Sequence, residues 1–140
     1  MASKNFETIV NDFEILDDWE DRYKYIIDLG KGIPDLNNSE KVDINKVEGC
    51  ASQVWIIPKV NELRDCRTFE FTGDSDALIV KGLIAVLMAL YNKCLMQELK
   101  KIDAYAELNR LGLEQHLSSQ RSNGLKSMIK RISNFANSEL

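Results

Sequence analysis

Residues 77–91 read ALIVKGLIAVLMALY, and Lys81 carries the only charge in this stretch. A helix that is apolar on nearly every side has to be covered by other elements almost all round. The stretch is shorter than the roughly 20 apolar residues that a bilayer-spanning helix needs. We therefore predict that residues 77–91 form a buried core helix around which the other elements pack.

The segment before this helix has an apolar period of two, which is typical of strands. Phe69 and Phe71 alternate with polar residues over residues 67–72, as in a half-exposed strand. Two further strands are predicted at residues 44–47 and 53–60. Residues 73–76, GDSD, are predicted to form a turn that starts the core helix. The sheet is expected to be small and antiparallel, with about three strands.

Helical periodicity dominates both ends of the chain. A first helix is predicted up to about Leu16, and a second from residue 19 to the glycines at 30 and 32. Residues 33–42 read as a loop, residues 99–111 as an amphipathic helix, 113–119 as a short turn or helix, and 123 or 125 to 136 as a last helix. The order of helices, strands and helices predicts the α+β class.

Length and charge narrow the class of protein. The chain has 140 residues, so residues 1–140 are predicted to form one domain. A net charge of −4 argues against a nucleic-acid surface, because phosphates are held mainly by clustered Lys and Arg. No signal peptide or membrane segment is recognisable, and three cysteines do not make a disulfide framework. A reducing, cytoplasmic location is the default expectation.

The charge is unevenly distributed along the chain. Residues 1–28 contain eight acidic and three basic side chains, whereas residues 118–140 contain four basic side chains and one acidic. The simplest interpretation is two solvated helix faces that attract each other weakly. The other interpretation is a dedicated docking surface.

Cys50 is the strongest candidate for chemistry. It follows Gly49 on a predicted loop that enters a strand, whereas a cysteine that only fills the core belongs on a strand or helix face. Glu48 is a nearby acid, so no local excess of positive charge is present to lower the pKa of the Cys50 thiol. Partial burial is expected to raise that pKa. Such a quiet thiol suits a covalent carrier whose electrophile arrives on a partner. It suits a cysteine hydrolase less well, because a hydrolase needs its own base and oxyanion donors.

The other candidates are weaker. Cys66 and Cys94 are interpreted as structural, and no spacing of cysteine and histidine predicts a metal site. His116 could be a base for Cys50, but a lone histidine near a helix end is more often a packing or capping residue. Arg121 is placed in a polar loop before the last helix, where it either forms a surface salt bridge or contacts the Cys50 loop or a partner.

Four segments resemble the SufE family of sulfur acceptors, in the family's order and over nearly the whole chain. They are VEGCASQVW at 47–55, FTGDSDA and IVKGL at 71–83, LGLEQHLS at 111–118 and RSNGL at 121–125. The first is the most specific. Ala51 departs from the larger polar residue expected in many relatives.

The resemblance implies a function that composition does not show. It implies an α+β fold similar to IscU-type scaffold proteins, with Cys50 accepting persulfide sulfur from a cysteine desulfurase of the SufS or CsdA type. It also implies that the chain stimulates this enzyme and passes the sulfur to an iron–sulfur scaffold of the SufBCD type. Pyridoxal phosphate would belong to the partner, since this chain has no phosphate-binding Gly-rich loop.

The resemblance also implies roles for individual residues. Gly49, Ala51, Ser52 and Gln53 would form a mobile transfer loop around the cysteine, flanked by Glu48. Asp74 and Arg121 would lie near this loop. These residues are the candidates for binding the partner.

Two alternatives stay open at the level of sequence. An IscU-like scaffold that binds zinc or a cluster requires more than one cysteine to converge in space. A cysteine enzyme that uses Cys50 with His116 requires the two side chains to meet. The carrier is favoured because it needs neither arrangement.

Overall fold

The computed structural model describes residues 4–139 as an α+β fold built on a three-stranded antiparallel sheet with the strand order β1-β2-β3. The elements are, in chain order, α1 (Lys4–Ile15), α2 (Trp19–Lys31), the 3-10 turn η1 (Asp43–Asn45), β1 (Val54–Glu62), β2 (Arg67–Ser75), α3 (Leu78–Tyr91), β3 (Cys94–Leu95), α4 (Met96–Leu99), α5 (Ala104–Asn109), α6 (Leu113–His116) and α7 (Ser119–Ser138). The predicted fold class is confirmed.

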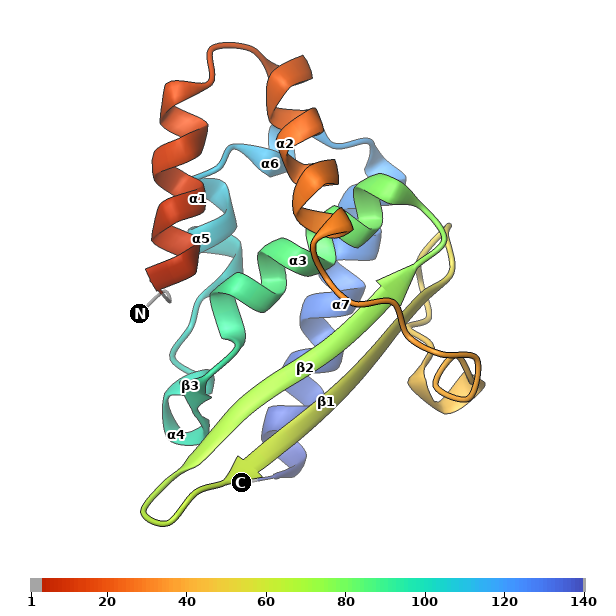
Figure 1. The fold of residues 1–140 in the computed structure, drawn as a ribbon, viewed down its shortest axis with the longest axis vertical. Helices are drawn as coiled ribbons and strands as arrows, with labels where there is room; N and C mark the ends of the chain where they lie inside the picture. Colours follow the sequence, from red (N-terminus) through yellow and green to blue (C-terminus); the bar gives the residue numbers. More distant parts are fainter. Residues whose placement is uncertain (1–3, 140) are drawn as a thin grey trace.

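The apolar helix α3 is the centre of the molecule. It packs against α1 and α2 and against β2, and Figure 1 shows it running between the pair of N-terminal helices and the long β1–β2 hairpin. Leu83, Ile84, Val86 and Leu87 are at most 1% exposed, as the lack of a polar face predicts. Within residues 4–139, no helix is both long and apolar enough to cross a bilayer.

The helices α1 and α2 form where their apolar periodicity predicts them. Phe6 and Phe13 are buried on one face of α1. The Asp18 carboxylate accepts a hydrogen bond from the Asp21 backbone N–H at 2.9 Å and so caps the start of α2. The predicted end needs one correction, because Gly30 lies inside α2 and only Gly32 caps it.

The sheet differs from the sequence prediction in two places. Residues 44–47 are not a strand: η1 occupies Asp43–Asn45, and only Lys46 forms a bridge, with Trp55. The short turn bonds of η1 and the turn at Glu48 and Gly49 leave too few extended residues for a ladder. The third strand is instead β3, whose two residues pair with Thr68 and Phe69.

Residues 73–76 are not the predicted turn. Gly73, Asp74 and Ser75 continue β2 and pair with Ile56, Trp55 and Val54. A Cβ atom on Gly73 would lie 2.9 Å from an Ile84 side-chain carbon and 3.0 Å from a neighbouring backbone oxygen. Glycine is therefore present for close packing of the strand on α3, not for a turn.

Two C-terminal helices begin after polar capping residues that the apolar periodicity did not reveal. The predicted helix 99–111 is wrong in its bounds: α4 ends at Leu99, and α5 covers only Ala104–Asn109, where the Asp103 carboxylate caps the start by accepting from the Ala106 N–H at 3.1 Å. The Ser118 hydroxyl accepts a hydrogen bond from the Arg121 N–H at 3.3 Å, so α7 begins at Ser119. Arg121 thus lies in the first turn of α7, not in a loop before it.

Candidate functional site

Cys50 lies on the segment between η1 and β1, in residues 48–53, which we call the cysteine loop. Gly49 turns the chain just before the thiol with a φ of 90°, a conformation that other residues rarely adopt. A Cβ atom at Gly49 would also lie 2.5 Å from the Ser127 hydroxyl oxygen on α7. The backbone conformation requires glycine here, and a larger residue would also displace the Ser127 hydroxyl.

The two ends of the cysteine loop are fixed to the sheet. The Val47 N–H donates to the Val54 carbonyl at 2.8 Å, and the Gln53 N–H donates to the Asp76 carboxylate at 3.0 Å. The residues between these bonds include the exposed Ala51. The loop is held at its ends and accessible in its middle.

The thiol itself is half-buried against α7. Its sulfur lies 3.7 Å from the Gly124 carbonyl oxygen, a weak S–H···O contact. A Cβ atom on Gly124 would be 3.5 Å from the sulfur, so any side chain larger than alanine at this position would push the thiol outward. Gly124 therefore provides the space in which the thiol rests.

A cavity of about 300 Å³, here called the thiol pocket, opens beside Cys50. Its walls come from the cysteine loop, α3 and α7, and its lining residues are Cys50, Ala51, Ser52, Val80, Leu83, Ser118, Gln120, Arg121, Gly124, Leu125 and Met128. The floor is apolar and the rim is polar. Its volume is at the lower end of the range for small-molecule sites.

Burial raises the pKa of the Cys50 thiol, and the negative charge of Glu48 raises it further. The direction of this shift is the one that the sequence predicted from partial burial. A thiolate is needed for nucleophilic attack, so the raised pKa lowers the fraction of this thiol that can attack at neutral pH.

We expect alkylation of Cys50 by iodoacetamide to show a pH midpoint above that of an ordinary thiol. The measurement uses a Cys66→Ser/Cys94→Ser variant, in which Cys50 is the only thiol, and the same variant unfolded in urea gives the ordinary midpoint. A folded midpoint at or below the unfolded one would contradict the burial of the thiol described above.

Arg121 is brought to the thiol pocket by the first turn of α7. Its side chain forms no ion pair with any residue in the described part of the chain. The surface salt bridge considered for it is therefore not formed. The guanidinium remains available to an anionic group at the pocket mouth.

Asp74 does not line the thiol pocket: it pairs with Trp55, two residues beyond the cysteine loop, and holds the loop before η1. Its carboxylate accepts from the backbone N–H groups of Leu36 at 3.0 Å and Ser75 at 2.8 Å. The ammonium groups of Lys41 and Lys81 each lie 3.4 Å from it. Burial alone would raise the pKa of Asp74, but these four partners outweigh it and hold the pKa below its usual value.

The three cysteines lie at separate places along the hairpin. Cys66 lies at its turn, where its carbonyl accepts from the Leu63 N–H, and Cys94 pairs with Phe69 in β3. Cys50 precedes β1 at the opposite end, and the eight register steps of the hairpin span roughly 27 Å. Among residues 4–139 no group of three or more His, Cys, Asp or Glu side chains is placed to hold a metal. The convergence that a scaffold site requires is not formed.

His116 packs against Trp19 instead of the thiol. The two rings stack with centroids 3.8 Å apart, and the His116 Nδ1 lies 3.1 Å from the Gly112 carbonyl. Its backbone carbonyl accepts a hydrogen bond from the Tyr23 hydroxyl. The imidazole is not among the residues that line the thiol pocket. The structure therefore supports the packing interpretation of His116.

Sequence reasoning missed the pocket residues that carry no obvious chemistry. Gly124 shapes the pocket through its small size, and Val80 and Leu83 contribute to its apolar wall. Ser127 lies outside the lining and faces Gly49. The available signal was the RSNGL segment, in which a buried glycine inside a helix indicates close approach of another group.

Comparison with known proteins agrees with this geometry. Residues 7–136 match the family model described as "SufE: Fe-S metabolism associated domain". An uncharacterized SufE-like protein of Rhizobium etli is 48% identical over 132 residues, which is 94% of this chain and 88% of that protein. An uncharacterized SufE-like protein of Rhizobium meliloti is 43% identical over 136 residues, 97% of each.

The fold is also similar to that of a solved structure. The solution structure of a hypothetical protein from Thermus thermophilus superposes with a TM-score of 0.75 at 14% identity, covering 99% of this chain and 97% of that one. At this identity the likeness concerns the fold alone. The family match and the two close relatives, by contrast, cover the cysteine loop and α7 together, and the chain belongs to the SufE family of proteins associated with iron–sulfur metabolism.

Proposed function

We propose that the chain is a sulfur acceptor that takes persulfide sulfur onto Cys50 from a pyridoxal-phosphate-dependent cysteine desulfurase. The observation that carries this proposal is the position of Cys50: a half-buried thiol on a loop fixed at both ends, beside a small pocket with a free guanidinium. Membership of a family associated with iron–sulfur metabolism supports it.

The transfer step is an exchange between a thiolate and a persulfide. The Cys50 thiolate attacks the outer sulfur of the partner's cysteine persulfide, a new S–S bond forms on Cys50, and the partner's S–S bond breaks. The partner's cysteine leaves as a thiolate and takes up the proton that Cys50 has lost, so no external oxidant or reductant is needed. Removal of the product sulfur frees the desulfurase for its next turnover, so the chain acts as an activator and not as a free-standing enzyme.

The raised pKa of the thiol is consistent with an acceptor whose sulfur is delivered by a partner enzyme. In the isolated chain Cys50 rests protonated against Gly124, which limits side reactions. Docking would draw the middle of the cysteine loop out of the pocket and place the thiol at the partner's persulfide. Arg121 would then hold the developing negative charge at the pocket mouth. From Cys50 the sulfur would pass to an iron–sulfur scaffold by the same exchange.

The proposal is tested by the intact mass of the protein after incubation with a cysteine desulfurase and cysteine. We expect a gain of one or more sulfur atoms that is lost on reduction. If the protein gains no sulfur while the desulfurase is shown to be active, the acceptor proposal is contradicted for that enzyme.

We expect Cys66→Ser and Cys94→Ser to leave sulfur acceptance nearly unchanged. Both side chains lie away from the thiol pocket, at the hairpin turn and in β3. The expected cost is about 1 kcal/mol of unfolding free energy or less for each, measured by urea denaturation beside the mass assay. Loss of transfer in either folded variant would point to a sulfur relay or to the scaffold alternative.

A further inference from the structure

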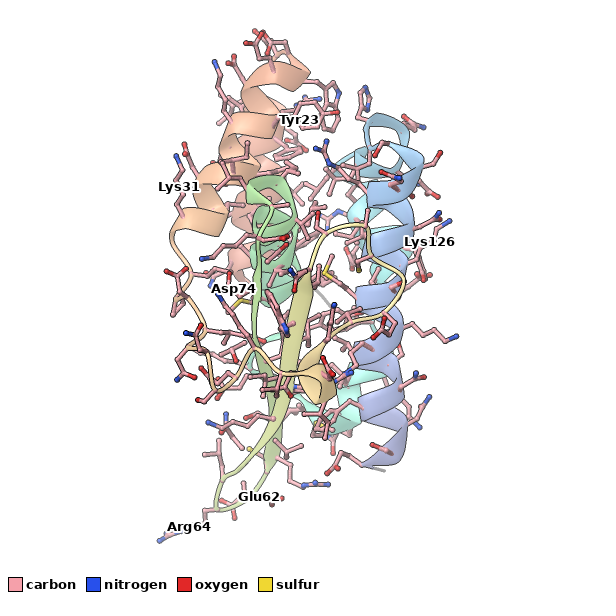
Figure 2. All side chains as sticks on the ribbon, turned by 90° about the vertical axis from the view of Figure 1, so that its right-hand side faces the viewer. Tyr23, Lys31, Glu62, Arg64, Asp74 and Lys126 are labelled. Atoms are coloured by element: carbon pink, nitrogen blue, oxygen red, sulfur yellow. The ribbon has the colours of Figure 1, made fainter. Side chains whose placement is uncertain are left out.

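The segment LGLEQHLS at 111–118 forms the short helix α6 and the connection to α7, and only its last residue, Ser118, lines the thiol pocket. His116 is an exposed residue, so its side chain contributes little burial to the core. It is nevertheless fixed to α2 twice. Its ring stacks on Trp19 with centroids 3.8 Å apart, and its carbonyl accepts a hydrogen bond from the Tyr23 hydroxyl. Figure 2 shows the labelled Tyr23 at the end of the molecule where α7 begins.

Trp19 is itself held between α1 and α2. Its ring meets Phe13 of α1 edge to face, with centroids 5.9 Å apart, and the guanidinium carbon of Arg22 lies 5.1 Å from the centroid of its ring. The same guanidinium donates to the Phe13 carbonyl at 2.9 Å and to the Leu16 carbonyl at 2.8 Å. The N-terminal helices therefore give His116 a fixed support.

The backbone between His116 and the thiol pocket has little slack. Only Leu117 separates His116 from Ser118, and Leu117 and Ser118 are both extended, with ψ of 147° and 161°. Leu117 packs against the core, and the Ser118 hydroxyl accepts from the Arg121 N–H in the first turn of α7. The position of His116 is therefore passed on, over two residues, to the turn that brings Arg121 to the pocket.

We propose that His116, stacked on Trp19, is a positioning residue that holds Arg121 at the thiol pocket. For its consequence in sulfur transfer this inference rests on the proposed function, and it adds residues remote from Cys50 that set the charge beside the thiol. Arg121 forms no ion pair with any of residues 4–139, so its place depends on where α7 begins. Without the stack, the connection before α7 would be held mainly by the packing of Leu117 on the core.

The test measures the charge beside the thiol and needs no partner. In a Cys66→Ser/Cys94→Ser background, Cys50 is alkylated at one pH with iodoacetate, which is an anion, and with iodoacetamide, which is neutral. A nearby guanidinium favours the anionic reagent. A change in thiol exposure or in the thiolate fraction alters both rates alike. The ratio of the iodoacetate rate to the iodoacetamide rate therefore reports the position of Arg121 and is not moved by a loss of stability alone.

We expect His116→Ala to lower this ratio about threefold, to the value of Arg121→Ala, as for one partly screened charge. His116→Phe keeps a flat ring against Trp19 and should retain the wild-type ratio. In the Arg121→Ala background, His116→Ala should have no further effect, because the charge that it displaces is already absent. Circular dichroism and urea denaturation establish that each variant is folded.

Tyr23→Phe provides a milder variant in case His116→Ala does not fold. It removes only the hydrogen bond to the His116 carbonyl, so it should lower the ratio in the same direction by a smaller factor. The inference is contradicted if the folded variant, His116→Ala or in its place Tyr23→Phe, keeps the wild-type ratio. It is also contradicted if Arg121→Ala keeps that ratio, or if His116→Ala lowers the ratio equally in the Arg121→Ala background, since His116 would then act without Arg121.

Sulfur transfer separates this inference from the function on which it rests. With a desulfurase that loads the wild type, His116→Ala should slow the gain of sulfur on Cys50 about threefold at saturating protein and leave the final amount unchanged. A rate equal to that of the wild type would contradict the role in transfer. If the wild type gains no sulfur from any active desulfurase, the acceptor function fails, while the alkylation ratio still decides whether His116 positions Arg121.

Discussion

Cys50→Ser is expected to abolish sulfur acceptance completely while the protein remains folded. A serine hydroxyl cannot form the S–S bond that stores the transferred sulfur, so the mass gain should fall to zero and stimulation of the desulfurase should be lost. The thiol is only half-buried, and its single polar contact is the weak one to the Gly124 carbonyl. A hydroxyl fits the same space, so the unfolding free energy should change by about 1 kcal/mol or less.

Cys66→Ser is the matched control, because it makes the same chemical change at a thiol outside the pocket. Intact mass after incubation with desulfurase and cysteine, together with urea denaturation, is measured for both variants and for the wild type. A Cys50→Ser protein that still gains reducible sulfur would move the acceptor to another cysteine. A Cys50→Ser protein that fails to fold would show that the side chain is needed for the core.

The loop position of Cys50 could be predicted because local sequence determines it. Gly49 before Cys50 and a β-type run after it require a loop that enters a strand, and the structure has this arrangement, with φ of 90° at the glycine. For Arg121 the sequence left contact with the Cys50 loop open beside a surface salt bridge, and the family resemblance favoured the loop. Its proximity arises from Ser118 capping α7 one turn earlier than the apolar period suggests.

Asp74 shows where local sequence is insufficient. GDSD has the composition of a turn, but pairing with residues 54–56 extends β2 through it. The carboxylate then points toward Leu36 and Lys41, which lie far away in sequence, and toward Lys81 on α3. Neither the strand partner nor these contacts can be inferred from neighbouring residues. The two-residue strand β3 was missed for the same reason, since its pairing with β2 is tertiary.

The second large effect is expected at the crossing of α2 and α3, for Gly82→Ala. A Cβ atom at Gly82 would lie 2.2 Å from the Ile26 carbonyl oxygen and 2.7 Å from the Ile26 carbonyl carbon. The facing Gly30 is equally tight, because its Cβ would lie 2.6 Å from the Gly82 backbone nitrogen. Backbone atoms cannot rotate away as a flexible side chain can, so the two helices must separate.

Whether Gly82→Ala stabilises or destabilises the protein depends on the size of two opposing free energies. Replacing glycine by alanine inside a helix favours folding by up to about 1 kcal/mol, whereas overpacking a tight core costs about 1–3 kcal/mol and occasionally more. The new Cβ atom would meet backbone atoms of the facing helix, so we expect a cost at the upper end of this overpacking range. We expect a net loss of about 2 kcal/mol of unfolding free energy and a fall in the melting temperature of roughly 5–8 °C.

Gly32→Ala is the control for glycine content, because its Cβ would lie no closer than 3.4 Å to another atom and its φ is −84°. It should change the unfolding free energy by about 0.5 kcal/mol or less. A Gly82→Ala protein as stable as the Gly32→Ala protein would contradict the close crossing.

The effect of Gly82→Ala should also reach the functional site, because Val80 and Leu83 flank Gly82 on α3 and line the thiol pocket. Alkylation of Cys50 should therefore be faster in folded Gly82→Ala than in Gly32→Ala at the same pH, since a displaced pocket wall exposes the thiol.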